Sequence, residues 1–214
     1  MYKRQVYLRA DVLADAVSLK KNIIITGSHG KTTTTSLVGK ILSDQRLDPT
    51  IINGGVINSF KSNAKLGKGD WAILEADESD GSFLKLPINY SIVTNIDYEH
   101  LDYYKSEDKL EKAFVDFANK VPFYGSCAIN ADNPKLFKLL KYFKKPYTTY
   151  GIKNSDVILD YQAKNCIYKN NISKYELYFR GKYIQEIEID FMGIENSLLG
   201  QQNVYRGGIQ GPHA

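Results

Sequence analysis

The fold of this chain is decided by the stretch Ile23-Ile24-Ile25-Thr26-Gly27-Ser28-His29-Gly30-Lys31-Thr32-Thr33-Thr34-Thr35. A short apolar run rich in β-branched residues meets a turn bounded by glycines, and a segment typical of a helix continues to about Ser43. A strand, a glycine loop and a helix start in this order are the parts of a phosphate-binding loop. The stretch therefore predicts a P-loop α/β fold.

The residue types of this loop suit phosphate binding. Glycines let the backbone curl so that successive N–H groups point at phosphate oxygens, and the helix N-terminus adds a partial positive charge. Lys31 can reach the β- and γ-phosphates of a nucleotide, and the Thr32 hydroxyl can bind Mg²⁺. The spacing between Gly27 and Gly30 is shorter than in the common motif. The alternative is a glycine turn that caps an ordinary helix, with Lys31 in solvent.

Composition limits the class of protein. The chain has 214 residues, a formal net charge of +4 and a hydrophobic fraction of 43%, which suits one large domain or a domain with an appendage. Basic and acidic residues are interspersed, so no dense basic run points to nucleic acid or an anionic membrane. No apolar run is long enough to cross a bilayer, and no signal-peptide pattern opens the chain. Cys127 and Cys166 form no CxxC pair, which favours a reduced, cytoplasmic compartment.

Strand and helix patterns alternate along most of the chain. Strands are predicted over residues 22–26, 50–53, 71–75, 91–94, 127–130 and 148–150, and helices over residues 11–19, 31–43, 107–119 and from Asn133-Pro134 onward. Such alternation predicts a mostly parallel sheet with helices on both faces, with ligands at the carboxyl ends of the strands. From about residue 156 the period changes, because Tyr175, Leu177 and Phe179 alternate with polar residues before a turn at Gly181. This pattern predicts a small antiparallel β meander near the C-terminus.

Acidic residues follow the strand predicted over residues 71–75. Glu75 ends that strand, and Asp77, Glu78 and Asp80 come next. Glu75 would then project at the sheet edge beside the phosphate loop, where a carboxylate suits Mg²⁺, directly or through water. The alternative is a solvated acidic loop.

A second polar cluster, Thr94-Asn95-Ile96-Asp97-Tyr98-Glu99-His100, follows the next strand. Its histidine, His100, can be a metal ligand, a general base, a phosphate-stabilising donor or an ordinary surface residue. Mg²⁺ prefers oxygen ligands, so chemistry alone does not favour His100 as its ligand.

These clusters together resemble the Mur ligase family, over most of residues 7–205. The motifs that carry the resemblance are Gly27-Ser28-His29-Gly30-Lys31-Thr32-Thr33, Glu75-Ala76-Asp77-Glu78-Ser79-Asp80, Thr94-Asn95-Ile96-Asp97 with His100, and Phe114-Val115-Asp116-Phe117 before Val121-Pro122-Phe123-Tyr124-Gly125. The resemblance implies a carbon–nitrogen ligase of peptidoglycan synthesis that uses ATP and Mg²⁺. Its substrates would be UDP-N-acetylmuramate and L-alanine, joined through an acyl phosphate.

The resemblance also implies roles for individual residues. Lys31, Glu75 and His100 would be catalytic, and Thr32, Glu75 and His100 would serve Mg²⁺. The residues implied to bind ATP are Gly27, Ser28, His29, Gly30, Lys31, Thr32, Thr33 and, on the adenine side, Asn203. Two positions depart from the family pattern, because Gln202 stands where the family usually has His and Glu99 where it usually has Asp.

The resemblance divides the chain into three parts: residues 1–21 as an interdomain segment, 22–199 as the central ATP-binding domain, and 200–214 as a truncated helix start and tail. The uridine-nucleotide and amino-acid domains of the family have no counterpart, so we expect the chain alone to bind nucleotide without ligating. Two alternatives stay open, a non-catalytic nucleotide-binding fragment and another P-loop ATPase or kinase.

Overall fold

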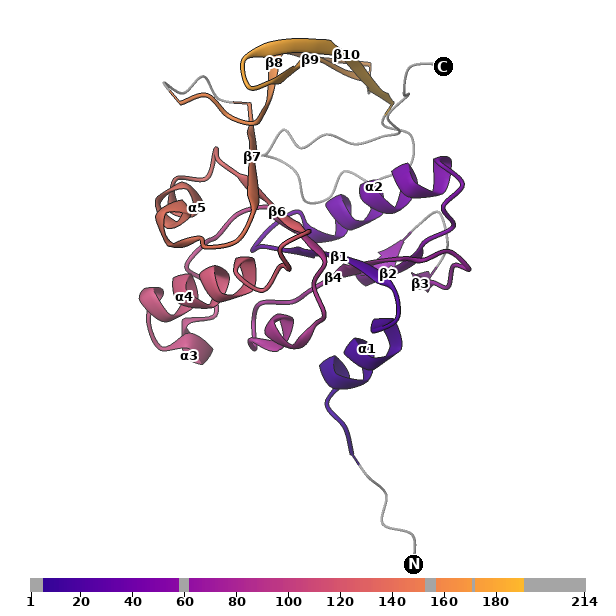
Figure 1. Ribbon diagram of the computed structural model, residues 1–214, viewed down its shortest axis with the longest axis vertical. Coiled ribbons are helices and arrows are strands. Elements are labelled where there is room, and N and C mark those ends of the chain that lie inside the picture. Colours follow the sequence, from indigo (N-terminus) through magenta and orange to yellow (C-terminus); the bar gives the residue numbers. More distant parts are fainter. Residues whose placement is uncertain (1–5, 58–61, 153–156, 171, 191–214) are drawn as a thin grey trace, which may run out of the picture.

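The computed structural model of this chain describes residues 6–57, 62–152, 157–170 and 172–190. In this part of the chain, ten strands form one sheet in the order β10-β9-β8-β7-β6-β5-β1-β4-β2-β3 (Figure 1). The strands are β1 (Lys21–Thr26), β2 (Thr50–Ile57), β3 (Ser62–Lys65), β4 (Trp71–Glu75), β5 (Tyr90–Val93), β6 (Ser126–Asn130), β7 (Tyr147–Gly151), β8 (Tyr161–Lys169), β9 (Ile172–Phe179) and β10 (Lys182–Asp190). The helices are α1 (Arg9–Val17), α2 (Lys31–Asp44), η1 (Ser82–Lys85), α3 (Leu101–Tyr104), α4 (Glu107–Ala118), α5 (Pro134–Leu139) and η2 (Leu140–Tyr142).

The centre of the sheet is parallel and its two ends are antiparallel. Strands β2, β4, β1, β5, β6, β7 and β8 pair in parallel, while β3 pairs antiparallel with β2 and β8, β9 and β10 form an antiparallel meander. The predicted α/β architecture with a C-terminal meander is therefore confirmed. None of the helices in the described ranges has both the length and the apolar character needed to cross a bilayer.

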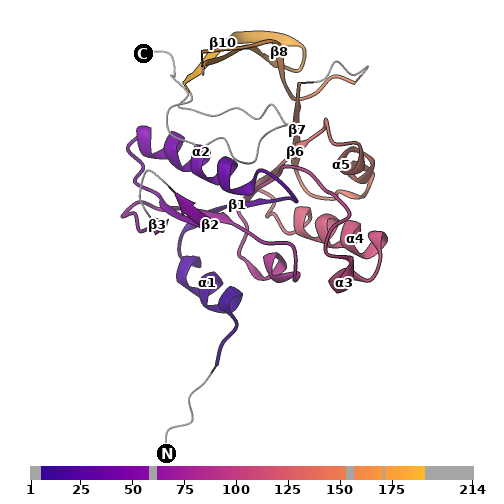
Figure 2. The same ribbon diagram turned by 180° about the vertical axis from the view of Figure 1, so that it is seen from behind.

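Helices cover both faces of the parallel strands (Figure 2). Helix α2 packs on one face, over a cluster of Ile25, Ile51 and Ile73. The opposite face carries the larger core, in which Phe83 of η1 stacks on Phe117 of α4 and packs at a tilt against Phe114 of the same helix. Because side chains alternate along a strand, neighbouring residues of β1 and β4 enter opposite clusters. Continuous isoleucine and leucine runs in these strands are the consequence of burial on both faces.

Side chains cap the starts of two helices, and the second of these caps is at the predicted Asn133-Pro134 opening. The Ser106 hydroxyl accepts a hydrogen bond from Lys109 N at the start of α4, and the Asn133 side chain accepts one from Leu136 N at the start of α5. Such bonds satisfy amides that have no partner within the helix. Helix α2 differs, because its N-cap is Gly30 in the left-handed region and no side chain caps it.

The structure corrects some predicted boundaries and adds elements. The strand predicted to stop before Gly54-Gly55 continues through both glycines to Ile57. Gly54 runs so close to Glu75 that an added Cβ would lie 2.8 Å from its Oε1 atom, so glycine permits the approach. The parallel part of the sheet extends beyond the strand predicted over residues 148–150, because β8 pairs in parallel with β7. Strand β3 and helix α3 have only four residues each, and the sequence did not predict them.

Several predictions concern residues outside the described ranges. Asn203, the helix start predicted near residue 200 and the C-terminal tail are among them, so these stay predictions.

Replacement of Phe83 by alanine tests the larger core. Phe83 is fully buried and stacks on Phe117 with ring centroids 5.0 Å apart. We expect Phe83→Ala to lower the free energy of unfolding by about 3–5 kcal/mol, because it removes a buried ring and leaves a cavity. Phe123→Ala is the matched control, since Phe123 is 86% exposed. Denaturant unfolding of both variants measures the effect, and equal losses would contradict this description of the core.

Candidate functional site: a phosphate loop and its neighbours

The loop between β1 and α2 requires glycine at its first position. Gly27 has φ of 132°, and a Cβ added there would lie 2.2 Å from Thr94 Oγ1. Gly30 has φ of 81° and turns the chain into α2. The first backbone bond at the start of α2 runs from Thr34 N to Gly30 O, at 3.0 Å. The amides of residues 31–33 therefore precede the hydrogen-bond ladder of the helix, which is the arrangement that binds anions.

The residues that follow β5 hold this loop in place. Asn95 Oδ1 accepts a hydrogen bond from His29 N at 2.8 Å, and Asn95 Nδ2 donates to His29 O at 3.0 Å. The Thr94 hydroxyl also donates to His29 O, at 2.7 Å. Asp97 N donates to the Ser28 hydroxyl at 2.8 Å. Both Thr94 and Asn95 are buried. The second polar cluster therefore fixes the position of the loop through these hydrogen bonds.

Lys31 points back into the loop and toward a buried carboxylate. Its ammonium donates to Gly27 O at 2.7 Å and to both carboxylate oxygens of Glu78, at 3.0 and 3.2 Å. The side chain of Glu78 is only 2% exposed, against 16% for Lys31. Burial raises the pKa of Glu78, and the nearby Lys31 charge partly opposes that rise. This ion pair is therefore part of the interior of the site.

Glu75 and Thr32 meet as the sequence predicts. The Thr32 hydroxyl donates to Glu75 Oε2 at 2.8 Å, and Gly54 N donates to the same oxygen at 3.0 Å. The register explains the encounter, because Glu75 pairs with Ile25 of β1, two residues before the phosphate loop. A hydroxyl and a carboxylate are both oxygen donors of the kind that Mg²⁺ takes, so these two residues fit the ion chemically.

The structure places the two histidines of the region differently. His29 Nε2 lies 3.1 Å from Asp97 Oδ2 and 3.6 Å from Glu99 Oε1. His100 is exposed, has φ of 58° at the start of α3, and lies 4.0 Å from Glu99 Oε2. In the described part of the chain, no three His, Cys, Asp or Glu side chains gather so as to hold a metal. The pairing of Glu75 with His100 around Mg²⁺ stays a prediction.

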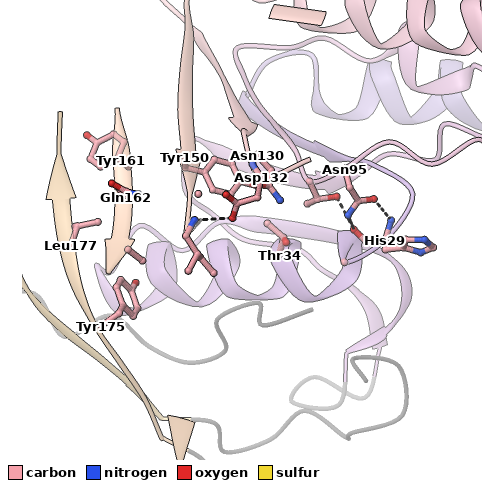
Figure 3. Close-up of a pocket in the computed structure, with 15 residues that line it drawn as sticks. His29, Thr34, Asn95, Asn130, Asp132, Tyr150, Tyr161, Gln162, Tyr175 and Leu177 are labelled. Atoms are coloured by element: carbon pink, nitrogen blue, oxygen red, sulfur yellow. Dashed lines mark hydrogen bonds between the residues drawn. The ribbon is translucent and has the colours of Figure 1, made fainter. Parts of the chain in front are cut away.

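A cavity of about 200 Å³ opens beside the phosphate loop (Figure 3). It joins the start of α2 to the ends of β6 and β7 and to the meander strands β8 and β9. Asp132 accepts a hydrogen bond from Ile152 N at 2.8 Å in its wall. The residues that line it are His29, Gly30, Thr34, Thr94, Asn95, Asn130, Asp132, Tyr150, Gly151, Ile152, Tyr161, Gln162, Ala163, Tyr175 and Leu177. The meander thus supplies an apolar and aromatic wall, a role that was not predicted for it.

A second cavity, of about 540 Å³, has Glu75 in its lining. Helix α1 and η1 form its walls, with Arg9 and Lys85 as basic residues and Asp77 and Asp80 as acidic ones. Lys85 also pairs with Asp11 of α1, at 2.9 Å. Glu75 therefore stands between the phosphate loop and a polar hollow large enough for a second molecule.

Three site residues were missed in the sequence analysis as individual contributors. Glu78 was read only as one member of an acidic cluster, because nothing local shows which carboxylate of a cluster turns inward. Asn95 gave a usable signal, since an asparagine directly after an apolar strand can bond a neighbouring loop. Gly54 gave another, since paired glycines inside a strand mark a close approach.

Comparison with known proteins agrees with this geometry. Residues 25–205 match the family model described as the Mur ligase middle domain. The UDP-N-acetylmuramate–L-alanine ligase of Pelagibacter ubique (strain HTCC1062) is 50% identical over 197 residues, which cover 89% of this chain and 42% of the relative. The ligase of the same name from Hydrogenobaculum sp. (strain Y04AAS1) is 45% identical over 192 residues, which cover 90% and 42%.

A solved structure of the family has the same fold. The UDP-N-acetylmuramate–alanine ligase of Thermotoga maritima gives a TM-score of 0.71 at 25% identity, over 85% of this chain and 40% of that one. This chain therefore spans about two fifths of the length of the relatives it matches. Since the family model covers most of the residues, the chain belongs to the Mur ligase family, and its fold is that of the middle domain.

Proposed function

We propose that this chain is the ATP-binding part of a cytoplasmic ligase that joins L-alanine to UDP-N-acetylmuramate in peptidoglycan synthesis. The observation that carries the proposal is the phosphate loop, in which Lys31 and Thr32 stand beside Glu78 and Glu75. The 45–50% identity to ligases of that name supports the choice of substrates. The central domain would then be residues 22–199.

The proposed reaction has two steps. The lactyl carboxylate of UDP-N-acetylmuramate attacks the γ-phosphorus of ATP, which gives an acyl phosphate and ADP. The amine of L-alanine then attacks the acyl carbon and expels phosphate, with loss of a proton. Phosphoryl transfer needs alignment and charge neutralisation rather than a protein nucleophile. The loop amides and Lys31 supply the charge, and the two cavities separate a place for the nucleotide from a place for the acceptor.

Thr32, Glu75 and His100 are the residues that we propose for Mg²⁺. Bound there, the ion would neutralise charge on the phosphates. Thr32 and Glu75 already lie within hydrogen-bond distance of each other, whereas His100 would have to approach them from the start of α3. The amides of residues 31–33 would bind the phosphates. The cavity beside His29 and Thr34 would take the nucleoside, with Asn203 proposed on its adenine side.

Substrate dependence tests this function against the alternatives. In an enzyme of the relatives' length that carries this sequence, we expect steady ADP release only when ATP, UDP-N-acetylmuramate and L-alanine are all present. Mass spectrometry should then detect UDP-N-acetylmuramoyl-L-alanine. Steady ADP release without either acceptor would indicate another P-loop ATPase, and nucleotide binding without any turnover would indicate a non-catalytic nucleotide-binding protein.

Lys31→Ala tests the loop itself. Removal of one preorganised charge donor typically costs about 10²–10³-fold in kcat, so we expect a loss of at least that size in the same enzyme. Lys40→Ala is the matched control, since Lys40 lies on the same helix, pairs with Asp44 and is 55% exposed. Initial rates at saturating ATP measure the effect. Near-normal turnover by Lys31→Ala would rule out the assigned role.

Glu75→Gln and His100→Ala test the Mg²⁺ assignment separately. Each substitution should raise the Mg²⁺ concentration that gives half-maximal activity, because each removes a proposed ligand. The effect of Glu75→Gln should be the larger, since Glu75 also bonds Thr32 and Gly54. The measurement is a Mg²⁺ titration of the initial rate for both variants. An unchanged titration for His100→Ala would show that His100 is a surface residue and not a ligand. The proposed Mg²⁺ ligands would then be Thr32 and Glu75 alone.

A further inference from the structure

The Lys31 ammonium is fully engaged by the protein in this structure. An ammonium has three N–H donors, and those of Lys31 face Gly27 O at 2.7 Å, the Glu78 carboxylate at 3.0 and 3.2 Å, and Ser28 O at a long 3.5 Å. Only the contact to Ser28 is weak by the usual geometry of such bonds. The strongest electrostatic partner of Lys31 is therefore a carboxylate of its own chain.

Glu78 is held firmly in its position. Its backbone carbonyl accepts hydrogen bonds from the buried Tyr104 hydroxyl and from Gly81 N, the latter at 3.2 Å. Its side chain has almost no contact with solvent. A carboxylate so placed cannot turn into water without a change in the loop over residues 76–81. Ion pairs of this kind are screened much less than pairs at the surface.

We propose that Glu78 is an affinity-determining residue: its carboxylate is the counter-ion of Lys31 in the phosphate loop, and a polyphosphate has to compete with it for Lys31. The inference rests on the proposed function, since it assumes that the loop binds phosphates. A bound polyphosphate would place further negative charge beside a carboxylate that cannot retreat. The repulsion lowers affinity for phosphates and leaves affinity for a nucleoside unchanged, because a nucleoside carries no such charge.

Glu78→Gln removes this charge and keeps the shape of the side chain and one acceptor oxygen. We expect it to bind ADP and inorganic tripolyphosphate about tenfold more tightly than the unaltered chain, since one like charge is removed at close range. Adenosine affinity should not change. Asp108→Asn is the control, because it removes the same charge from an exposed residue of α4 that lines neither cavity. Its affinities should stay within about twofold of the unaltered chain. Calorimetry in Mg²⁺-free buffer measures all three ligands.

A second measurement tests the ion pair without any nucleotide. Reductive methylation followed by mass spectrometry reports how fast each lysine reacts. Lys31 should react much more slowly than the exposed Lys40, and Glu78→Gln should speed the reaction of Lys31 alone. If Glu78→Gln does not fold by circular dichroism, Glu78→Asp keeps the charge but shortens the reach. That variant should show the same faster reaction at Lys31.

The outcomes separate the inference from the proposed function. Unchanged or weaker tripolyphosphate binding by a folded Glu78→Gln variant overturns the inference, as does a Lys31 that reacts as fast as Lys40 in the unaltered chain. Tripolyphosphate binding without nucleotide binding in the unaltered chain contradicts the proposed function alone. In that case the tripolyphosphate affinities of the unaltered chain and of Glu78→Gln still decide whether Glu78 competes for Lys31.

Discussion

Parallel pairing of β1 with β4 on one side and β5 on the other is the constraint on which the rest of this structure depends. The pairing brings the carboxyl ends of three strands to one edge of the sheet. At that edge, Asn95 accepts a hydrogen bond from the loop after β1. The carboxylates of Glu75 and Glu78 lie beside the first residues of α2, where they bond Thr32 and Lys31. A parallel sheet buried on both faces tolerates no slip in register, because one residue of slip would exchange the two cores.

Much of this arrangement could be predicted from the sequence because its signals are local. The glycine loop, the capped helices and the apolar strand runs each depend on residues within one short window, so β4 and the start of α2 were predicted at their observed residues. The encounter of Thr32 with Glu75 followed from topology, since Glu75 ends β4 and Thr32 lies in the helix start that follows the loop after the neighbouring strand β1.

The rest could not be predicted because it depends on contacts between distant residues. Nothing near Glu78 marks it as the buried member of an acidic run, and only its approach to Lys31 makes that burial tolerable. Strand β8 was missed because its residues are mostly exposed, so its sequence lacks a clear alternation. That the meander continues the main sheet, instead of standing apart, is set by the pairing of Tyr150 with Tyr161.

The cavity beside the phosphate loop has walls that lie far apart in the sequence, from His29 to Leu177. One wall belongs to the first βα unit and the other to the meander, and the strands between them link the two through a single sheet. A molecule that fills this space touches both the first βα unit and the meander, and its binding free energy adds to the stability of the folded state. A ligand bound in this cavity would therefore slow amide hydrogen exchange in β8 and β9 as well as in α2. The meander would then open locally less often when the ligand is bound.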